Sequence, residues 1–259
     1  MKRIFYDKAW LWIYCALNIL FCIVSAFFMK NNYNCVVPIY MWMPTWWIII
    51  LKKTDSIKRI IVKTPSLTEV LFSATIGIAL ILLPYVLYAL VFKKTIMFNN
   101  LNSMWVIQIF IDIITTSLLV MGEEIAWRGV LYEELKVITT KGKAISFVGI
   151  IWIVWHIPLV ISGDYLYNKI RLDSIFFFIV NAMLINRIFF IIKEYNFINL
   201  ILIHSTLNVM ESYRGELIIL HKNAQYYIGE TGLFTTISWF FMILLYKAIQ
   251  RKDVKKGKT

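Results

Sequence analysis

Long apolar segments alternate with short polar breaks along most of the chain. Eight segments are interpreted as membrane-crossing helices: residues 10–28, 36–51, 69–92, 103–121, 145–161, 174–192, 197–210 and 231–248. A helix needs about 20 predominantly apolar residues to cross a hydrocarbon core of roughly 30 Å, and several segments approach or exceed that length. The second segment carries Pro38 and Pro44, so we expect it to be kinked or only partly embedded. The pattern predicts an all-α fold, a polytopic transmembrane helix bundle of about eight spans.

The composition is typical of a membrane protein. Hydrophobic residues make up 60% of the chain, aromatic residues make up 16%, and the mean hydropathy is +0.70. The basic start leads into an apolar stretch that is too long for the core of a cleaved signal peptide, so residues 10–28 are expected to form the first span. Internal repeats and low-complexity linkers are absent from the sequence, which favours a single integral membrane domain over residues 1–259.

Lys and Arg are distributed unevenly between the two sides of the predicted bundle. An even number of spans places both termini on one side, together with the basic segments 52–65, 121–138 and 247–258. Because positive residues accumulate at the cytoplasmic face, both termini are predicted to be cytoplasmic, in a multi-pass protein of the cell membrane. Segments 52–65 and 247–258 are expected to rest on anionic lipid. This topology also accounts for the net charge of +12, so no nucleic-acid partner is expected.

The three cysteines show no metal-binding or redox spacing. Cys15 and Cys22 fall within the first apolar segment, and Cys35 precedes the second. Neither a CxxC nor a CxxH pattern is present. We therefore predict that all three are small core residues without a disulfide or metal role.

A charged cluster follows the fourth apolar segment, and residues 121–138 continue its helical pattern. Glu123 and Glu124 lie roughly 100° apart on a helix. Arg128 lies one turn beyond Glu124, the i,i+4 spacing that favours an ion pair, and this leaves Glu123 on a neighbouring face. The same pattern is also typical of a solvated helix end with a surface salt bridge.

One histidine lies deep in the fifth apolar segment. His156 is flanked by Trp152 and Trp155, and it precedes Pro158, whose ring frees a backbone carbonyl that another group must satisfy. An ionisable group at membrane depth costs roughly 2.5–3.5 kcal/mol and is expected to be functional. A lone histidine can equally be a hydrogen-bonded core residue.

Further polar residues lie inside the sixth and seventh segments. His204 and Asn208 are four residues apart, so both point along one face of a helix. Such a polar stripe can carry chemistry, or it can join helices through hydrogen bonds. For Asn181 and Asn186 the second interpretation is preferred.

Together these groups supply the elements of peptide-bond hydrolysis, because one group can activate water and others can stabilise an oxyanion. On these residues the chain resembles the type II CAAX prenyl protease and bacteriocin-processing family of intramembrane endopeptidases, whose motifs are Glu-Glu-x-x-x-Arg, Phe-x-x-x-His and His-x-x-x-Asn. The likeness covers about residues 100–212 and includes the continuation Arg128–Tyr132 after the first motif. Trp152 stands where the second motif usually has Phe, an aromatic exchange that is expected to preserve packing but that can resize the pocket.

The resemblance implies catalytic roles for the six motif residues. They are Glu123, Glu124, Arg128, His156, His204 and Asn208. Glu123 would work with His156 to deprotonate a water that attacks the scissile carbonyl. Glu124 and Arg128 would fix the local helix and the charge state of the site.

The resemblance also bears on the oxyanion and on a metal. His204 and Asn208 would donate hydrogen bonds to the developing oxyanion, and Gly129 would allow close helix approach. Two histidines and two carboxylates also allow a zinc site with an open position for water. The sequence has no His-Glu-x-x-His helix, and an amide such as Asn208 is a poor zinc ligand, so no cofactor is firmly predicted and zinc at the Glu/His site stays open.

The depth of His156, roughly 18 Å from the predicted cytoplasmic face at 1.5 Å per residue, calls for a cavity. We expect this cavity to open to the cytoplasm and laterally to lipid, where it would accept a peptide or a lipid-anchored protein. The richness in Ile, Lys and Asn is typical of an A/T-rich bacterial genome, so we expect a bacterial plasma membrane. Prenylated CAAX substrates are then not expected, and the substrate would be a peptide pheromone, a bacteriocin leader or another small membrane peptide.

Two other functions stay open at the level of the sequence. A non-catalytic membrane scaffold or a bacteriocin self-immunity protein would keep the same fold, although the intact motifs argue against it. A transporter would use Asn181, Asn186 and Arg187 as a polar pathway, but the sequence shows no pair of interrupted spans at corresponding positions of two halves.

Overall fold

The computed structural model describes residues 9–30, 36–58, 60, 63–93, 97–98, 103–162, 172–213, 218–219 and 224–255. Within these ranges the fold is helical, apart from the short antiparallel pair of β1 (Met97–Phe98) with β2 (Ile218–Ile219). The eight predicted segments correspond to α2 (Ala9–Lys30), α3 (Val36–Ile50), α5 (Leu67–Phe92), α6 (Ser103–Glu124), α8 (Lys141–Ser162), α9 (Leu172–Tyr195), α10 (Phe197–Ser212) and α12 (Leu233–Lys255). Shorter elements are α4 (Thr54–Lys58), the π-helix η1 (Ile125–Leu131), α7 (Tyr132–Ile138) and the 3-10 turn η2 (Ala224–Tyr226). The prediction of a helical bundle is confirmed.

Five helical stretches are long and apolar enough to cross a membrane. They are Ala9–Phe28, Leu67–Phe92, Met104–Ile138, Lys141–Val160 and Asp173–Glu194, and the apolar helices Val36–Ile50 and Leu233–Ile249 are shorter. Large apolar side chains such as Trp12, Phe27, Leu67 and Leu90 are exposed on the outside of the bundle, where lipid would cover them. The chain is therefore a multi-pass membrane protein, while the number of eight crossings and the cytoplasmic termini stay predictions.

The fourth predicted span does not end at residue 121. Helix α6 continues without a break through η1 into α7, so Met104–Ile138 is one helical stretch of 35 residues. Glu123 and Glu124 therefore lie in its middle rather than at a solvated end. Arg128 is completely buried, which corrects its assignment to a cytoplasmic basic segment.

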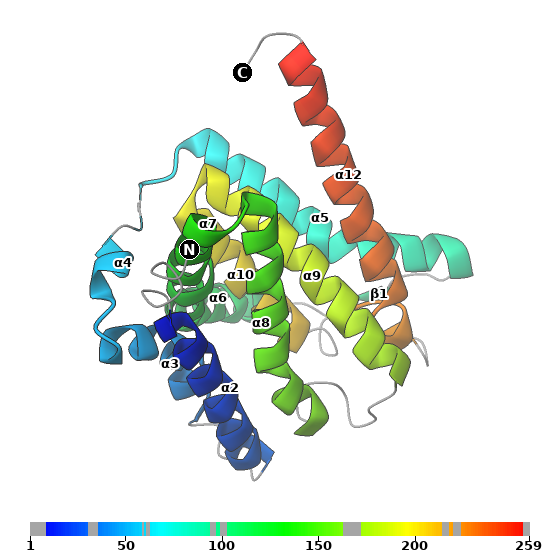
Figure 1. Cartoon of the computed structure of the whole chain (residues 1–259). Helices are drawn as coiled ribbons and strands as arrows, with labels where there is room; N and C mark the ends of the chain where they lie inside the picture. Colours follow the sequence, from blue (N-terminus) through cyan, green and yellow to red (C-terminus); the bar gives the residue numbers. More distant parts are fainter. Residues whose placement is uncertain are drawn as a thin grey trace.

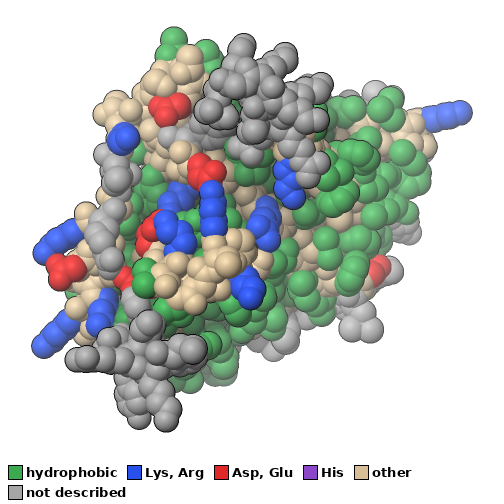
Figure 2. All heavy atoms as spheres, turned by 45° about the horizontal axis from the view of Figure 1, so that its top comes forward, with side chains coloured by type: hydrophobic (Ala, Val, Ile, Leu, Met, Phe, Trp, Pro, Cys, Tyr) green, Lys and Arg blue, Asp and Glu red, His purple; other side chains and the backbone are tan. Residues whose placement is uncertain are grey.

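The described ends of the helices gather at two opposite ends of the bundle. At the lysine-rich end, Lys193 bonds Glu133 at 3.0 Å, Lys141 pairs with Glu194, and Asn196 Nδ2 donates to the Lys63 carbonyl. Figure 2 shows Lys and Arg side chains gathered on the face that comes forward from the top of Figure 1, where α7 ends and α8 begins. The opposite end, called here the strand end, holds β1, β2, the end of α10 and the turn that leads into α12.

Helices α3, α6 and α10 pack closely around the motif residues. Thr45 Oγ1 of α3 donates to the Gly122 carbonyl at 2.6 Å, and a Cβ at Gly122 would lie 2.9 Å from the Met41 carbonyl oxygen. Across α6, Ser117 and Ser205 of α10 share a hydrogen bond of 2.7 Å. These contacts hold the turn just before Glu123 between two neighbouring helices.

Prolines within the helices leave backbone carbonyls without their usual partners, and side chains of other helices bond nearby. Pro84 of α5 cannot bond the Leu80 carbonyl, which instead accepts from Trp239 Nε1 of α12 at 3.1 Å. This bond ties α12 to the middle of α5. A second bond, from Thr236 Oγ1 to Asn181 Oδ1 at 2.7 Å, ties α12 to α9.

The structure tests part of the predictions for the cysteines and for the two basic segments expected on lipid. Cys22 is buried and Cys15 partly buried, both as free thiols, whereas Cys35 lies outside the described residues. Segment 52–65 contains α4, and Ser56 donates to Glu134 of α7 at 2.8 Å, so this segment packs on the protein as well. Its contact with lipid stays a prediction. For the tail 247–258, backbone is described only up to Lys255.

Candidate active site

The six motif residues lie on four elements, α6, the π-helix η1, α8 and α10. Glu123 and Glu124 end α6, and η1 carries Arg128. π-helical turns widen a helix and occur frequently at functional sites. Gly129 lets this turn come close, because a Cβ there would collide with Ile60 after α4. The close approach predicted for Gly129 is thus present, with a loop residue rather than a second spanning helix.

Glu124 and Arg128 form a buried pair behind the cavity wall. Arg128 Nη1 lies 2.9 Å from Glu124 Oε1, and both side chains are fully buried. Arg128 Nη2 donates to Asn186 Oδ1 at 3.2 Å, and the guanidinium carbon lies 4.5 Å from the centre of the Trp152 ring. The pair predicted from the i,i+4 spacing is confirmed, but as a buried ion pair instead of a surface salt bridge.

Asn186 connects this pair to a neighbouring helix. Its Nδ2 donates to the Ile145 carbonyl of α8 at 3.0 Å while its Oδ1 accepts from Arg128. Gly149 makes room for it, since a Cβ there would lie 2.8 Å from Asn186 Nδ2. The predicted helix-joining role of Asn186 therefore fits the structure, and the amide also supports Arg128.

Glu123 points to the other side of the helix, toward a cavity. Its side chain is 3% exposed, and its Oε2 accepts from Trp152 Nε1 at 3.1 Å. The described residues offer Glu123 no second hydrogen bond. This carboxylate is therefore held by one oxygen and has the other available to a substrate or a water.

His156 lies beside Glu123 on α8 and shares its neighbour. His156 Nδ1 is 2.8 Å from the Trp152 carbonyl oxygen, and the two rings meet edge to face at 4.7 Å between centroids. A carbonyl can only accept, so this bond places the proton on Nδ1 and leaves a lone pair on Nε2. Trp152 thus contacts both groups, through its indole N–H and through its backbone oxygen.

The turn after His156 is anchored from two other helices. The Trp155 carbonyl accepts from Tyr40 Oη of α3 at 3.2 Å and from the Cys22 thiol of α2. The rings of Tyr40 and Trp155 stack at 4.1 Å. These bonds lie beside the Pro158 kink, whereas the carbonyl that Pro158 itself frees is that of Val154, so the prediction for that carbonyl stays open.

His204 and Asn208 enter from α10. His204 Nδ1 lies 2.7 Å from Glu124 Oε1, so one carboxylate oxygen contacts both the guanidinium and the imidazole. The His204 ring also packs on Phe189 at 4.8 Å between centroids. Asn208 lies one turn further on and lines the cavity. The structure thus joins the first and third motifs through a direct bond.

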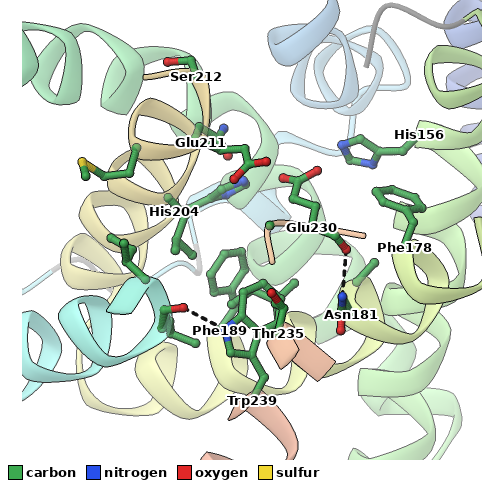
Figure 3. Close-up of a pocket in the computed structure, with 18 of the residues that line it drawn as sticks. His156, Phe178, Asn181, Phe189, His204, Glu211, Ser212, Glu230, Thr235 and Trp239 are labelled. Carbon is green, nitrogen blue, oxygen red and sulfur yellow. Dashed lines mark hydrogen bonds between the residues drawn. The ribbon is translucent and has the colours of Figure 1, made fainter. Parts of the chain in front are cut away.

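A cavity of about 710 Å³ connects these residues. Glu123, His156, His204 and Asn208 all line it, whereas Glu124 and Arg128 lie behind its wall. Figure 3 shows His156 and His204 projecting toward the same space from different helices. Four of the six predicted site residues therefore share one surface, and the other two support it.

Sequence reasoning missed further polar residues of the lining. Glu211 follows Asn208 by three positions, so helical periodicity alone puts it on the His204 face of α10. Glu230 and Thr235 come from the turn and helix after a long break, and no sequence signal connects them to the motifs. Asn181 Nδ2 donates to the Glu230 carbonyl at 2.8 Å and fixes that turn.

The cavity lies toward the strand end of the bundle. Its lining includes the end of α10, at Glu211 and Ser212, together with Gly229 and Glu230. These residues lie at the end opposite the lysine-rich end. The side of the membrane to which the cavity opens stays a prediction.

The donor set does not fit a zinc site. The described residues contain no group of three or more His, Cys, Asp or Glu side chains arranged to hold a metal ion. His204 Nδ1 and the Oε1 of Glu124 bond each other, and His156 Nδ1 bonds the Trp152 carbonyl. A buried guanidinium beside Glu124 also opposes a further cation. We therefore derive no step through a metal.

The comparison with protein families agrees with this geometry. The family model described as type II CAAX prenyl endopeptidase Rce1-like matches residues 102–210, a range that holds all three motifs. No curated protein matches the chain. The matched family is one of CAAX-type proteases, which supports protease activity on a protein substrate in a membrane. Over residues 102–210 the chain is therefore similar to the Rce1-like family of type II CAAX prenyl endopeptidases.

Proposed function

We propose that the chain is an intramembrane endopeptidase that cleaves small membrane-associated peptides or lipid-tethered proteins. The observation that carries this proposal is the common cavity lined by Glu123, His156, His204 and Asn208. A bacterial plasma membrane fits the composition, and the substrate would enter the cavity while its anchor stays in lipid.

Glu123 and His156 would activate the water. The free oxygen of Glu123 and the Nε2 lone pair of His156 can both accept a proton, and Trp152 holds the two groups in register. The resulting hydroxide attacks the scissile carbonyl carbon. The abstracted proton then passes to the leaving amine as the C–N bond breaks.

His204 and Asn208 would stabilise the tetrahedral oxyanion. His204 Nδ1 lies 2.7 Å from the Glu124 carboxylate, and an imidazolium at this position would donate from Nδ1 to Glu124 and from Nε2 into the cavity. The Asn208 amide supplies a second donor from the next turn of α10. Arg128 in turn orients Glu124 through their 2.9 Å contact.

The test is cleavage of a panel of small membrane-associated peptides by purified protein in lipid. Wild type should cleave at least one peptide, and His204→Ala and Asn208→Ala should each lower kcat by about 10²–10³, the usual effect of removing an oxyanion donor. A parallel assay with a chelator should retain activity, because the donor set does not fit zinc. Cleavage that stops with chelator and returns with added zinc contradicts the metal-free mechanism. A wild type that cleaves nothing, while both variants still support the cellular phenotype, favours a scaffold.

The side of access can be measured separately. With the lysine-rich end in the cytoplasm, the strand end faces outward. In a variant whose three native cysteines are replaced, Ser212→Cys should then react with a membrane-impermeant maleimide on intact cells. Lys58→Cys, exposed near the lysine-rich end, should react only after the cells are permeabilised. The reverse pattern would place the cavity mouth in the cytoplasm and overturn the predicted topology.

A further inference from the structure

Two carboxylates line the cavity beyond the catalytic residues. Glu211 comes from the end of α10 and Glu230 from the turn before α12, and Figure 3 shows both side chains projecting into the space that His204 and His156 face. Among the described residues of the lining, three Glu side chains occur without any Lys or Arg. This end of the cavity therefore carries negative charge within reach of the bond to be cleaved.

A buried hydroxyl in the same lining lacks a partner. Thr235 is 1% exposed, and its Oγ1 makes no hydrogen bond with the part of the chain that the structure describes. Nearby Asn181 has its Nδ2 bonded to the Glu230 and Gly232 carbonyls and its Oδ1 bonded by Thr236. Because an unsatisfied buried polar group costs about 1–3 kcal/mol, a bound donor group is the natural partner of Thr235.

Several hydrogen bonds fix the turn that carries Glu230. Phe234 N donates to the Tyr227 carbonyl at 2.7 Å, and the two bonds from Asn181 fix the backbone at both ends of residues 230–232. Gly229 supplies the positive φ of 80° that the turn requires. The Glu230 carboxylate is therefore presented from a defined backbone position.

We propose that Glu211, Glu230 and Thr235 form a subsite for a cationic group of the substrate, a Lys or Arg side chain. Helix geometry gives the distance between this subsite and the oxyanion residue His204. Glu211 lies seven residues beyond His204, which is about 10 Å along α10, and an extended peptide covers this length in about three residues. The basic residue should therefore lie about three residues from the scissile bond. This inference rests on the proposed peptidase function and names its substrate class.

A cationic partner fits these groups better than a neutral one. Two carboxylates and a hydroxyl oxygen can all accept, and an ammonium or guanidinium offers several donors and the opposite charge. In a cavity shielded by apolar walls the Coulomb attraction is stronger than at an open surface. An acidic substrate group would be repelled at the same position.

Cleavage of matched peptides tests the subsite. In acyl-anchored peptides in lipid, one Lys replaces Gln at each position within about four residues of the cleaved bond, a window set by the extended rise. Wild type should favour Lys over Gln by about tenfold in kcat/KM at a position near three residues from the bond. Glu211→Gln and Glu230→Gln should each lower this ratio, and Glu211→Lys should favour a Glu peptide. Asp55→Asn, which removes an exposed charge outside the cavity, should keep the wild-type ratio.

Binding separates a failed subsite from a failed peptidase. Fluorescent Lys and Gln peptides are titrated against Glu123→Gln protein in nanodiscs, with and without Glu211→Gln. Tighter binding of the Lys peptide that disappears in Glu211→Gln supports the subsite, even where wild type cleaves nothing and the peptidase proposal fails. Equal binding of both peptides, or cleavage by wild type without any preference for Lys, overturns the subsite.

Discussion

Glu123→Gln should abolish most peptidase activity while the protein stays folded. Gln keeps the size of the side chain and an oxygen that can accept from Trp152 Nε1, so the 3.1 Å contact can persist. It removes the carboxylate that would accept the proton of the attacking water. General base catalysis typically contributes about 10²–10⁴-fold, so kcat/KM should fall by that factor. The measurement is peptide cleavage in lipid together with the thermal unfolding midpoint, which should change little.

Trp152→Phe is the matched comparison for this prediction. It keeps an aromatic ring beside Arg128 and His156, restores the residue usual in the second motif, and removes the indole N–H that holds Glu123. We expect a smaller loss, about tenfold in kcat with KM little changed, because the carboxylate is misoriented but still present. Asp55→Asn should behave as wild type. Wild-type cleavage by Glu123→Gln would remove Glu123 from the mechanism.

Much of the bundle can be predicted from the sequence, because membrane helices are long, apolar segments that hydropathy identifies. Each of the eight apolar segments forms a helix, and the spacing of Glu124 and Arg128 predicts their bond. The helical pattern of residues 121–138 predicts that the helix continues past α6, and the structure confirms this. The sequence does not show that Glu123, Glu124 and Arg128 are buried, because the same residues are also typical of a solvated helix end.

The site is predictable where one helix carries the signal and unpredictable where helices must meet. The i,i+4 spacing places His204 and Asn208 on one face, and the structure puts both in the cavity lining. The bond of His204 to Glu124 depends on how α10 packs on α6, which no local pattern encodes. The same holds for Glu230, which reaches the cavity through a turn fixed by Asn181.

The second large effect is expected in the buried ion pair, where stability rather than chemistry should respond. Arg128→Met would leave the Glu124 carboxylate buried with His204 as its remaining partner and would remove the contact to Asn186. Glu124→Gln would leave the guanidinium without an opposing charge on that side. Breaking a fully buried pair by removing one partner typically costs about 3–5 kcal/mol of unfolding free energy. Each variant should therefore unfold at a markedly lower denaturant concentration or temperature than wild type.

The double variant distinguishes a coupled pair from two independent losses. In Glu124→Gln/Arg128→Met neither charge is left buried alone, so its loss of stability should be clearly smaller than the sum of the single losses. Lys58→Met serves as the control, because Lys58 pairs with Asp55 at 3.0 Å on the exposed surface and should contribute little. Additive losses would mean that Arg128 stabilises the fold through its contacts with Trp152, Phe189 and Asn186 rather than through Glu124. In that case another contact would have to orient Glu124 toward His204.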